Sequence, residues 1–188
     1  LSGRYDVIRE IGHGGMGTVY EAKERALTER HVALKVLSRE YSREKDFPSR
    51  FRGEIKTMAD LRHTGIVTLF SADEAEEYVY FAMEYIEGKT LQEKLVEDGV
   101  FGIEETVRIA KELCAALEYA HGKGVIHRDL KPENIMVDGD GSVRIMDFGI
   151  AKTLGGTRNT KTGHSIGTPM YMSPEQCTAN AEVDARSD

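Results

Sequence analysis

The chain of 188 residues is long enough for one large domain or two small lobes, and 40% hydrophobic with 30% charged residues is typical of a globular protein. Its 25 basic and 32 acidic side chains give a formal net charge of −7, which argues against nucleic acid as a partner because nucleic-acid-binding surfaces are usually basic. No apolar run reaches the roughly 18 residues of a membrane span and no secretory leader is visible, so we expect no membrane span in this chain.

The cysteine content indicates a reducing compartment. Cys114 and Cys177 lack the spacing of zinc ligands, and nothing in the sequence supports a disulfide between them. Cys114 falls on the apolar side of a predicted helix, where we expect its thiol to be buried as a small hydrophobe. We therefore predict a cytoplasmic location, with a parent protein that is still free to carry a membrane anchor elsewhere.

The first part of the chain is predicted to be mostly β-strand. Strands are expected at 5–11, 18–23 and 31–37, where β-branched and apolar residues are frequent. An amphipathic helix follows, because apolar residues recur at steps of three and four: Phe51, Ile55, Met58 and Leu61. Two more strands are expected at 66–70 and 78–84, with the acidic residues 73–77 forming a solvated turn between them.

The pattern changes to helix after Gly88. One long helix is predicted by an apolar stripe that ends at two glycines, Gly122 and Gly124. The stripe consists of Ile103, Val107, Ala110, Cys114, Leu117 and His121. A hairpin is expected from 135–137 to 143–146, and the polar residues 152–165 are expected to form a mobile loop. The sequence therefore predicts a β-rich lobe over 1–86 and a helix-rich lobe over 87–188.

A glycine-rich segment lies between the first two predicted strands. It reads Gly12-His13-Gly14-Gly15-Met16-Gly17 and matches the pattern G-x-G-x-x-G. Because strand residues follow Gly17, the glycines cap a hairpin and do not open a dinucleotide-binding helix. Such a hairpin lets backbone N–H groups approach phosphates, although a plain flexible turn explains the same residues equally well.

Lys35 lies inside an apolar strand, where lysine is rarely buried without a partner. A snorkelling surface lysine is the simpler interpretation of such a residue taken alone. Glu54 on the amphipathic helix offers a carboxylate partner, and the paired ammonium could then point at an anionic ligand. The alternative for Glu54 is a solvated charge on a helix surface.

The stretch from His127 to Asn134 carries the most specific arrangement of polar residues. Asp129 could orient a hydroxyl and accept its proton, and Lys131 could neutralise a transferring phosphoryl group. Asn134 could bind Mg²⁺ through its amide oxygen. Asp147 begins the sequence Asp-Phe-Gly after the predicted hairpin, where its alternative is an ordinary turn residue. Two such carboxylates near one phosphate are the minimum for phosphoryl transfer.

Taken in order, these motifs resemble the protein kinase family, and the resemblance covers Tyr5 to Asp188. They are joined in this comparison by Val32-Ala33-Leu34-Lys35 and by Ser173-Pro174-Glu175. The resemblance implies an α+β bilobal fold, with a small β-rich N-lobe that contains one key helix and a helical C-lobe that is shorter than usual.

The resemblance also implies roles for individual residues. Asp129, Lys131, Lys35 and Glu54 would be catalytic, while Asn134 and Asp147 would hold Mg²⁺. ATP would be bound by the glycine-rich hairpin, by Lys35 and by residues around the adenine ring. These residues are Gly12, His13, Gly14, Gly15, Gly17, Val19, Ala33, Met83, Glu84, Ile86 and Met136.

The order Asp129-Leu130-Lys131 and Thr168 before Pro169 are similar to serine/threonine kinases, and the glycine-rich segment and 167–175 look most like the bacterial branch. Protein substrates with Ser or Thr hydroxyls are therefore expected. Arg128 before the catalytic aspartate implies activation-loop phosphorylation, for which Thr160 and Thr162 are the candidates, modified in trans by a second copy.

The sequence is compatible with two functions. The first is an active serine/threonine kinase that uses ATP and Mg²⁺. The alternative is a nucleotide-binding or interaction module without turnover, because the family's helical lobe normally continues well beyond the length seen here.

Overall fold

A computed structural model describes residues 3–14, 17–25, 30–38, 55, 57–75, 78–148, 169–178 and 182–188. Outside these ranges lie the predicted loop at 152–165 and the predicted site residues Gly15, Glu54, Thr160 and Thr162. The chain forms two compact units: Leu1–Asp60 with Thr68–Ile86, and Leu61–Val67 with Glu87–Asp188. The short segment Leu61–Val67 thus belongs to the second unit, whereas the sequence predicts that residues 1–86 form one lobe.

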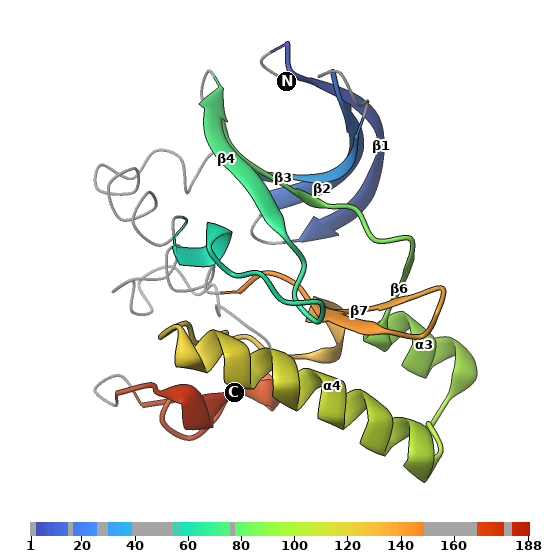
Figure 1. Cartoon of the computed structure of the whole chain (residues 1–188), viewed down its shortest axis with the longest axis vertical. Coiled ribbons are helices and arrows are strands. Elements are labelled where there is room, and N and C mark those ends of the chain that lie inside the picture. The colour runs from blue at the N-terminus through green and yellow to red at the C-terminus, as the bar shows by residue number, and fades with distance from the viewer. Residues whose placement is uncertain are drawn as a thin grey trace. The chain divides into compact units, whose positions relative to one another are not determined.

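The first unit contains a five-stranded antiparallel sheet with the strand order β1-β2-β3-β5-β4 (Figure 1). Its strands are β1 (Tyr5–Gly14), β2 (Gly17–Glu24), β3 (His31–Leu37), β4 (Leu69–Ala75) and β5 (Tyr78–Glu84). The strands predicted at 5–11, 18–23, 31–37 and 78–84 are therefore confirmed.

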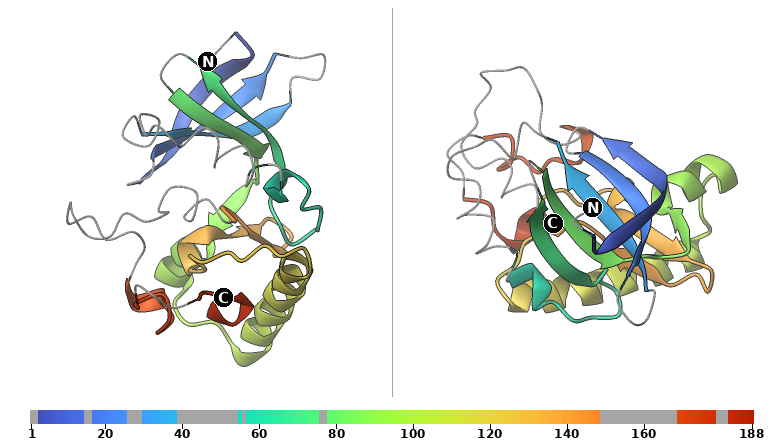
Figure 2. Two further views of the ribbon diagram at one scale, coloured as in Figure 1. Left: turned by 90° about the vertical axis from the view of Figure 1, so that its left-hand side faces the viewer. Right: turned by 90° about the horizontal axis from the view of Figure 1, so that it is seen from above.

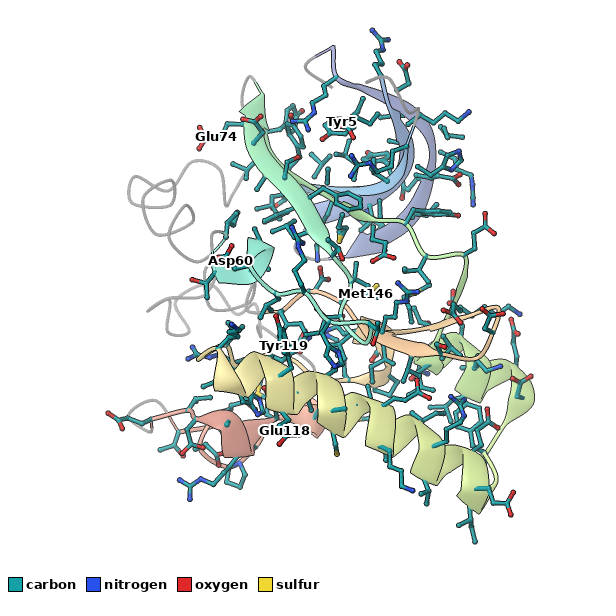
Figure 3. All side chains as sticks on the ribbon, viewed as in Figure 1. Tyr5, Asp60, Glu74, Glu118, Tyr119 and Met146 are labelled. Carbon is teal, nitrogen blue, oxygen red and sulfur yellow. The ribbon has the colours of Figure 1, made fainter. Side chains whose placement is uncertain are left out.

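One face of this sheet packs a core of buried side chains. Tyr5 and Tyr80 meet edge to face with ring centroids 5.8 Å apart, and Figure 3 shows Tyr5 inside the curve of the sheet. The other buried members of this core are Ala22, Val32, Leu34 and Ala82. Because side chains alternate along a strand, residues 19, 33 and 35 project from the opposite face.

The strand predicted at 66–70 was wrong in its position. The strand β4 begins at Leu69 and continues to Ala75, so Asp73 and Glu74 lie in the strand and not in a turn. β4 is the last strand in the sheet order, and an edge strand can direct charged side chains into solvent. Ile66 instead bridges Ile145 within the second unit.

The predicted amphipathic helix is confirmed for the part that the structure describes. Ile55 and 57–59 are helical, and Met58 is buried. Leu61 follows the helix and packs in a core of the second unit together with Ile66 and Ile145.

In the residues that the structure describes, the second unit combines a small sheet with two α-helices. The three-stranded sheet has the order β6-β7-β8, and β6 (Gly88–Thr90) and α3 (Leu91–Asp98) open the unit. The predicted hairpin is confirmed as β7 (Ile135–Asp138) and β8 (Val143–Ile145). The 3-10 helices are η1 (Pro132–Asn134), η2 (Pro169–Tyr171) and η3 (Ala185–Ser187).

The start of α3 was missed in the sequence, although a signal was present. Thr90 Oγ1 accepts a hydrogen bond from the backbone N–H of Glu93, and the Glu93 carboxylate accepts one from the backbone N–H of Thr90. This reciprocal capping box satisfies two backbone donors that the first helical turn leaves without intrahelical partners. It fixes the point where the chain changes from strand to helix.

The long helix α4 (Ile103–Gly122) has the predicted length, but the predicted apolar stripe is not its buried face. Ile103 is 85% exposed, Val107 is 45% exposed, and Cys114 is exposed as well. The buried positions are Ile109, Ala116 and Ala120. These residues also recur at helical spacing, so the helix has more than one apolar face and its periodicity alone could not select between them.

The small residues of α4 decide its packing. Ala116 and Ala120 let the helix approach Val125, Ile145 and Phe148 in one core, while Ile109 packs with β7 and β8 in another. Figure 2 shows α4 beside the β7–β8 hairpin, with the C-terminal residues close to it. Among the described residues, no helix combines the length and the apolarity needed to cross a bilayer.

Candidate active site

Gly14 ends β1 and Gly17 begins β2, and the two glycines pair with each other. Gly17 has a φ of 148°, and a Cβ atom there would lie 2.0 Å from the carbonyl oxygen of Val36. Glycine is therefore required at this position by the close approach of β3 as well as by the backbone angle. His13 Nδ1 and Thr18 Oγ1, 3.0 Å apart, connect the two strands next to the turn.

The predicted nucleotide-contacting residues of the sheet share one face. Val19 lies opposite Lys35, and Ala33 lies opposite Met83. Directly paired residues of antiparallel strands project from the same side, so the four side chains gather there, away from the core around Tyr5. Lys35 is only 7% exposed, which excludes the interpretation of a snorkelling surface lysine. Its predicted partner Glu54 lies outside the described residues.

The segment after β5 carries the two residues predicted to meet adenine. The backbone N–H of Glu84 donates to the carbonyl oxygen of Thr68 at 2.9 Å, and the Glu84 carboxylate accepts from the Thr68 N–H at 3.3 Å. A contact from Glu84 to a base therefore has to come from its carbonyl oxygen. Ile86 is half-buried and is the last residue of the first unit.

In the second unit, Asp129, Lys131 and Asn134 come together. Lys131 Nζ lies 2.9 Å from Asp129 Oδ2. Asn134 Nδ2 donates to the same Oδ2 at 3.0 Å and to the backbone carbonyl of Asp129 at 2.7 Å. Because the amide nitrogen of Asn134 donates to Asp129, its Oδ1 is the side-chain atom that could bind a metal ion.

The residue before Asp147 is tied directly to Asn134. The backbone N–H of Met146, labelled in Figure 3, donates to the carbonyl oxygen of Asn134 at 2.9 Å. Asp147 itself has a φ of 60°, a left-handed conformation that is uncommon for a residue other than glycine. Such strain is concentrated at functional sites. Met136, predicted to touch adenine, lies in β7 opposite Thr90 and Arg144.

The donor set fits a magnesium ion. Asn134 and Asp147 offer an amide and a carboxylate oxygen, and Mg²⁺ in nucleotide sites typically takes one or two protein carboxylates with phosphate oxygens and water. The described residues contain no group of three or more His, Cys, Asp and Glu side chains suited to a metal, so an all-protein metal centre is not seen among them.

Asp188 is the residue whose role sequence reasoning did not assign. Its carboxylate is fully buried and accepts hydrogen bonds from the backbone N–H groups of His127 and Arg128, both at 2.7 Å. His121 Nε2 lies 2.8 Å from the same carboxylate. Arg128 has a φ of 70°, so Asp188 holds a strained backbone directly before Asp129. No local sequence pattern predicts this contact, because it joins residues about 60 positions apart.

The side chain of His127 is completely buried. Its Nε2 lies 2.7 Å from the carbonyl oxygen of Met146, and its Nδ1 accepts from the backbone N–H of Asp129 at 3.2 Å. Only the neutral tautomer with a proton on Nε2 satisfies both contacts. Burial lowers the pKa of His127, against smaller opposing effects of the Met146 carbonyl and of Asp188, Asp147 and Asp129. Its ring also meets Phe148 edge on, with centroids 4.8 Å apart.

The lowered pKa of His127 predicts a loss of stability in mild acid. Below about pH 6.5 the unfolded chain binds a proton that the folded protein resists, so the free energy of unfolding falls as the pH falls from about 7 to about 5. The contribution of one such group is at most about 1.4 kcal/mol per pH unit. The free energy of unfolding, measured by urea denaturation at several pH values in this range, should depend less steeply on pH in His127→Gln than in the wild type. The exposed His13, replaced by glutamine, is the control, and equal slopes for all three proteins would contradict the prediction.

The profile described as the protein kinase domain matches residues 5–188, so the chain belongs to the protein kinase family. It is 39% identical over 176 residues to the serine/threonine-protein kinase PrkC of Bacillus subtilis, covering 94% of this chain and 27% of PrkC. It is 42% identical over 194 residues to the serine/threonine-protein kinase PknB of Mycolicibacterium smegmatis, covering 100% of this chain and 31% of PknB.

The fold agrees with the same family. The crystal structure of the Mycobacterium tuberculosis PknI kinase domain matches with a TM-score of 0.79 and 29% identity, covering 98% of this chain and 69% of that chain. The predicted α+β kinase fold is therefore confirmed, as is the resemblance to bacterial serine/threonine kinases. The chain spans less than a third of the length of these two curated relatives.

Proposed function

We propose that this protein transfers the γ-phosphoryl group of ATP to Ser and Thr hydroxyls of protein substrates. The observation that carries the proposal is the arrangement around Asp129, whose carboxylate is contacted by Lys131 and Asn134 within 3.0 Å. In this arrangement Asp129 orients the attacking hydroxyl and accepts its proton, while Lys131 neutralises negative charge on the transferring group.

Residues of each unit have nucleotide-binding roles in this proposal. Asn134 and Asp147 would hold Mg²⁺, which would supply positive charge to offset the charge of the phosphates. Lys35 contacts the phosphates beneath the glycine-rich hairpin and pairs with Glu54. Val19, Ala33, Met83 and Met136 surround the adenine ring, and the backbone of Glu84 and Ile86 hydrogen-bonds it. The shared sheet face of Val19, Ala33, Lys35 and Met83 supports this assignment.

Radiolabel transfer from ATP to a generic basic protein tests the proposal in the full protein. We expect transfer by the wild type with Mg²⁺, and a loss of at least about a hundredfold in Asp147→Asn, because the substitution removes a metal-binding charge. Excess EDTA should abolish transfer by the wild type. Equal transfer by the two proteins would refute the assignment, and nucleotide binding without transfer by either would favour the alternative, a binding module.

We also propose regulation by phosphorylation at Thr160 and Thr162, carried out in trans by a second copy. A phosphate there would pair with Arg128 through charge-assisted hydrogen bonds. Both threonines lie outside the described residues, so the proposal rests on their sequence positions. Mass spectrometry after the same incubation with ATP provides the test, and phosphate found only at other positions would remove this assignment. A cytoplasmic catalytic domain in a membrane-anchored parent protein fits this scheme.

A further inference from the structure

The side-chain amide of Gln176 joins two segments of the second unit. Its Nε2 donates to the carbonyl oxygen of Arg128 at 2.6 Å, and its Oε1 accepts from the backbone N–H of Ser173 at 2.8 Å. The two contacts require opposite ends of the amide, since a carbonyl can only accept and an N–H can only donate. One orientation of the amide therefore satisfies both.

The peptide group between Arg128 and Asp129 is held on both of its sides. Gln176 binds its carbonyl oxygen, and His127 Nδ1 accepts from its N–H at 3.2 Å. Asp188 binds the preceding N–H, that of Arg128, at 2.7 Å. This peptide follows the left-handed backbone of Arg128 and leads directly into Asp129. Rotating the peptide, and with it the direction of the Asp129 side chain, would break the contact from Gln176.

We propose that Gln176 is a positioning residue for Asp129, which couples the orientation of the catalytic carboxylate to the Ser173–Gln176 turn. This inference rests on the proposed kinase function. The turn is ordered by its own backbone, because the N–H of Cys177 donates to the carbonyl oxygen of Ser173 at 3.2 Å. A displacement of this turn would withdraw the donor from Arg128 and loosen Asp129, although Gln176 itself does not touch the reacting groups.

Replacement of Gln176 with leucine removes both polar contacts at similar size. We expect kcat for peptide phosphorylation to fall about tenfold, as for the loss of one hydrogen bond to a group that orients the transition state. The KM for ATP should change by less than about twofold, because the nucleotide is bound by other residues. The matched control is Gln92→Leu, at the other glutamine of the sequence, in α3, where we expect both parameters to remain at the wild-type values.

Replacement of Gln176 with glutamate separates positioning from simple packing. A deprotonated carboxylate would set an acceptor against the carbonyl oxygen of Arg128, whereas a protonated carboxyl could donate to it as the amide does. The ratio of kcat in Gln176→Glu to kcat in the wild type should therefore rise as the pH is lowered from about 8 to about 6. A packing role predicts a ratio that does not depend on pH.

A measurement without catalysis keeps this proposal distinct from the proposed function. Hydrogen exchange of the Asp129 amide should be faster in Gln176→Leu by about tenfold, and should be unchanged in Gln92→Leu. If the wild type transfers no phosphate, the kinase assignment fails while the exchange result still decides whether Gln176 holds the peptide. Unchanged exchange at Asp129, or an unchanged kcat in Gln176→Leu together with a flat pH ratio in Gln176→Glu, would overturn the proposal.

Discussion

Replacing Asp188 with alanine is expected to lower the free energy of unfolding by about 3 kcal/mol, because buried backbone donors then lose their acceptor. The carboxylate is fully buried and binds the N–H groups of His127 and Arg128, which lose this acceptor when it is removed. Each buried donor left without a partner costs about 1–3 kcal/mol. Urea denaturation at neutral pH, followed by circular dichroism, measures the change.

The matched control for Asp188 is Asp184 on the same segment. Asp184 contacts Arg186 with both carboxylate oxygens, but this pair is exposed and water can replace either partner. Asp184 also accepts from the backbone N–H of Arg186 at the start of η3, so Asp184→Ala should lower the free energy of unfolding slightly, well below the effect of Asp188→Ala. If the two alanine variants unfold at the same urea concentration as the wild type, Asp188 does not hold the loop in the way described.

Replacing Asp129 with asparagine is expected to reduce kcat by about a thousandfold, since the substitution keeps the shape of the side chain and removes its basicity. An asparagine oxygen can still accept from Lys131 or Asn134, so the loop should remain folded. The affinity for ATP should change little, because Asp129 is not assigned to nucleotide binding. Steady-state phosphorylation kinetics and nucleotide titration, carried out on the same preparation, separate the two quantities.

Asp140 provides the control for this charge change. It is exposed in the turn between β7 and β8, and it has no assigned role in the candidate site. Asp140→Asn should have wild-type kcat and the same affinity for ATP. Turnover by Asp129→Asn within about tenfold of the wild type would mean that another group acts as the base.

Asp129 and Asp188 have different roles in the candidate catalytic loop. Asp129 is proposed to do the chemistry, while Asp188 and His127 hold the backbone that carries it. Loss of Asp188 should therefore affect both stability and turnover, whereas loss of the Asp129 carboxylate should affect turnover alone. This difference can be measured on one set of purified variants.

Much of the candidate site could be predicted because its residues occur as short, ordered motifs. The glycine hairpin, the strand that carries Lys35 and the loop from His127 to Asn134 each depend on neighbours within a few positions, and the structure gives them the expected local form. The β-branched, aromatic and apolar residues of β3 and β5 were equally informative, because such residues favour strands. Pairing of Lys35 with Glu54 and the roles of Thr160 and Thr162 stay predictions.

The sequence by itself determined four of the five strands of the first sheet, the length of α4 and the family of motifs, because these follow from local spacing and residue type. Only the tertiary structure decided which side of α4 is buried, that acidic residues extend β4, and that Asp188 and Gln176 reach back to Arg128. Helical periodicity shows that a helix has apolar faces, but it does not show which of these faces another element will cover. Hydrogen bonds between distant segments produce no regular spacing in the sequence, because they depend on which parts of the chain come together in the folded protein.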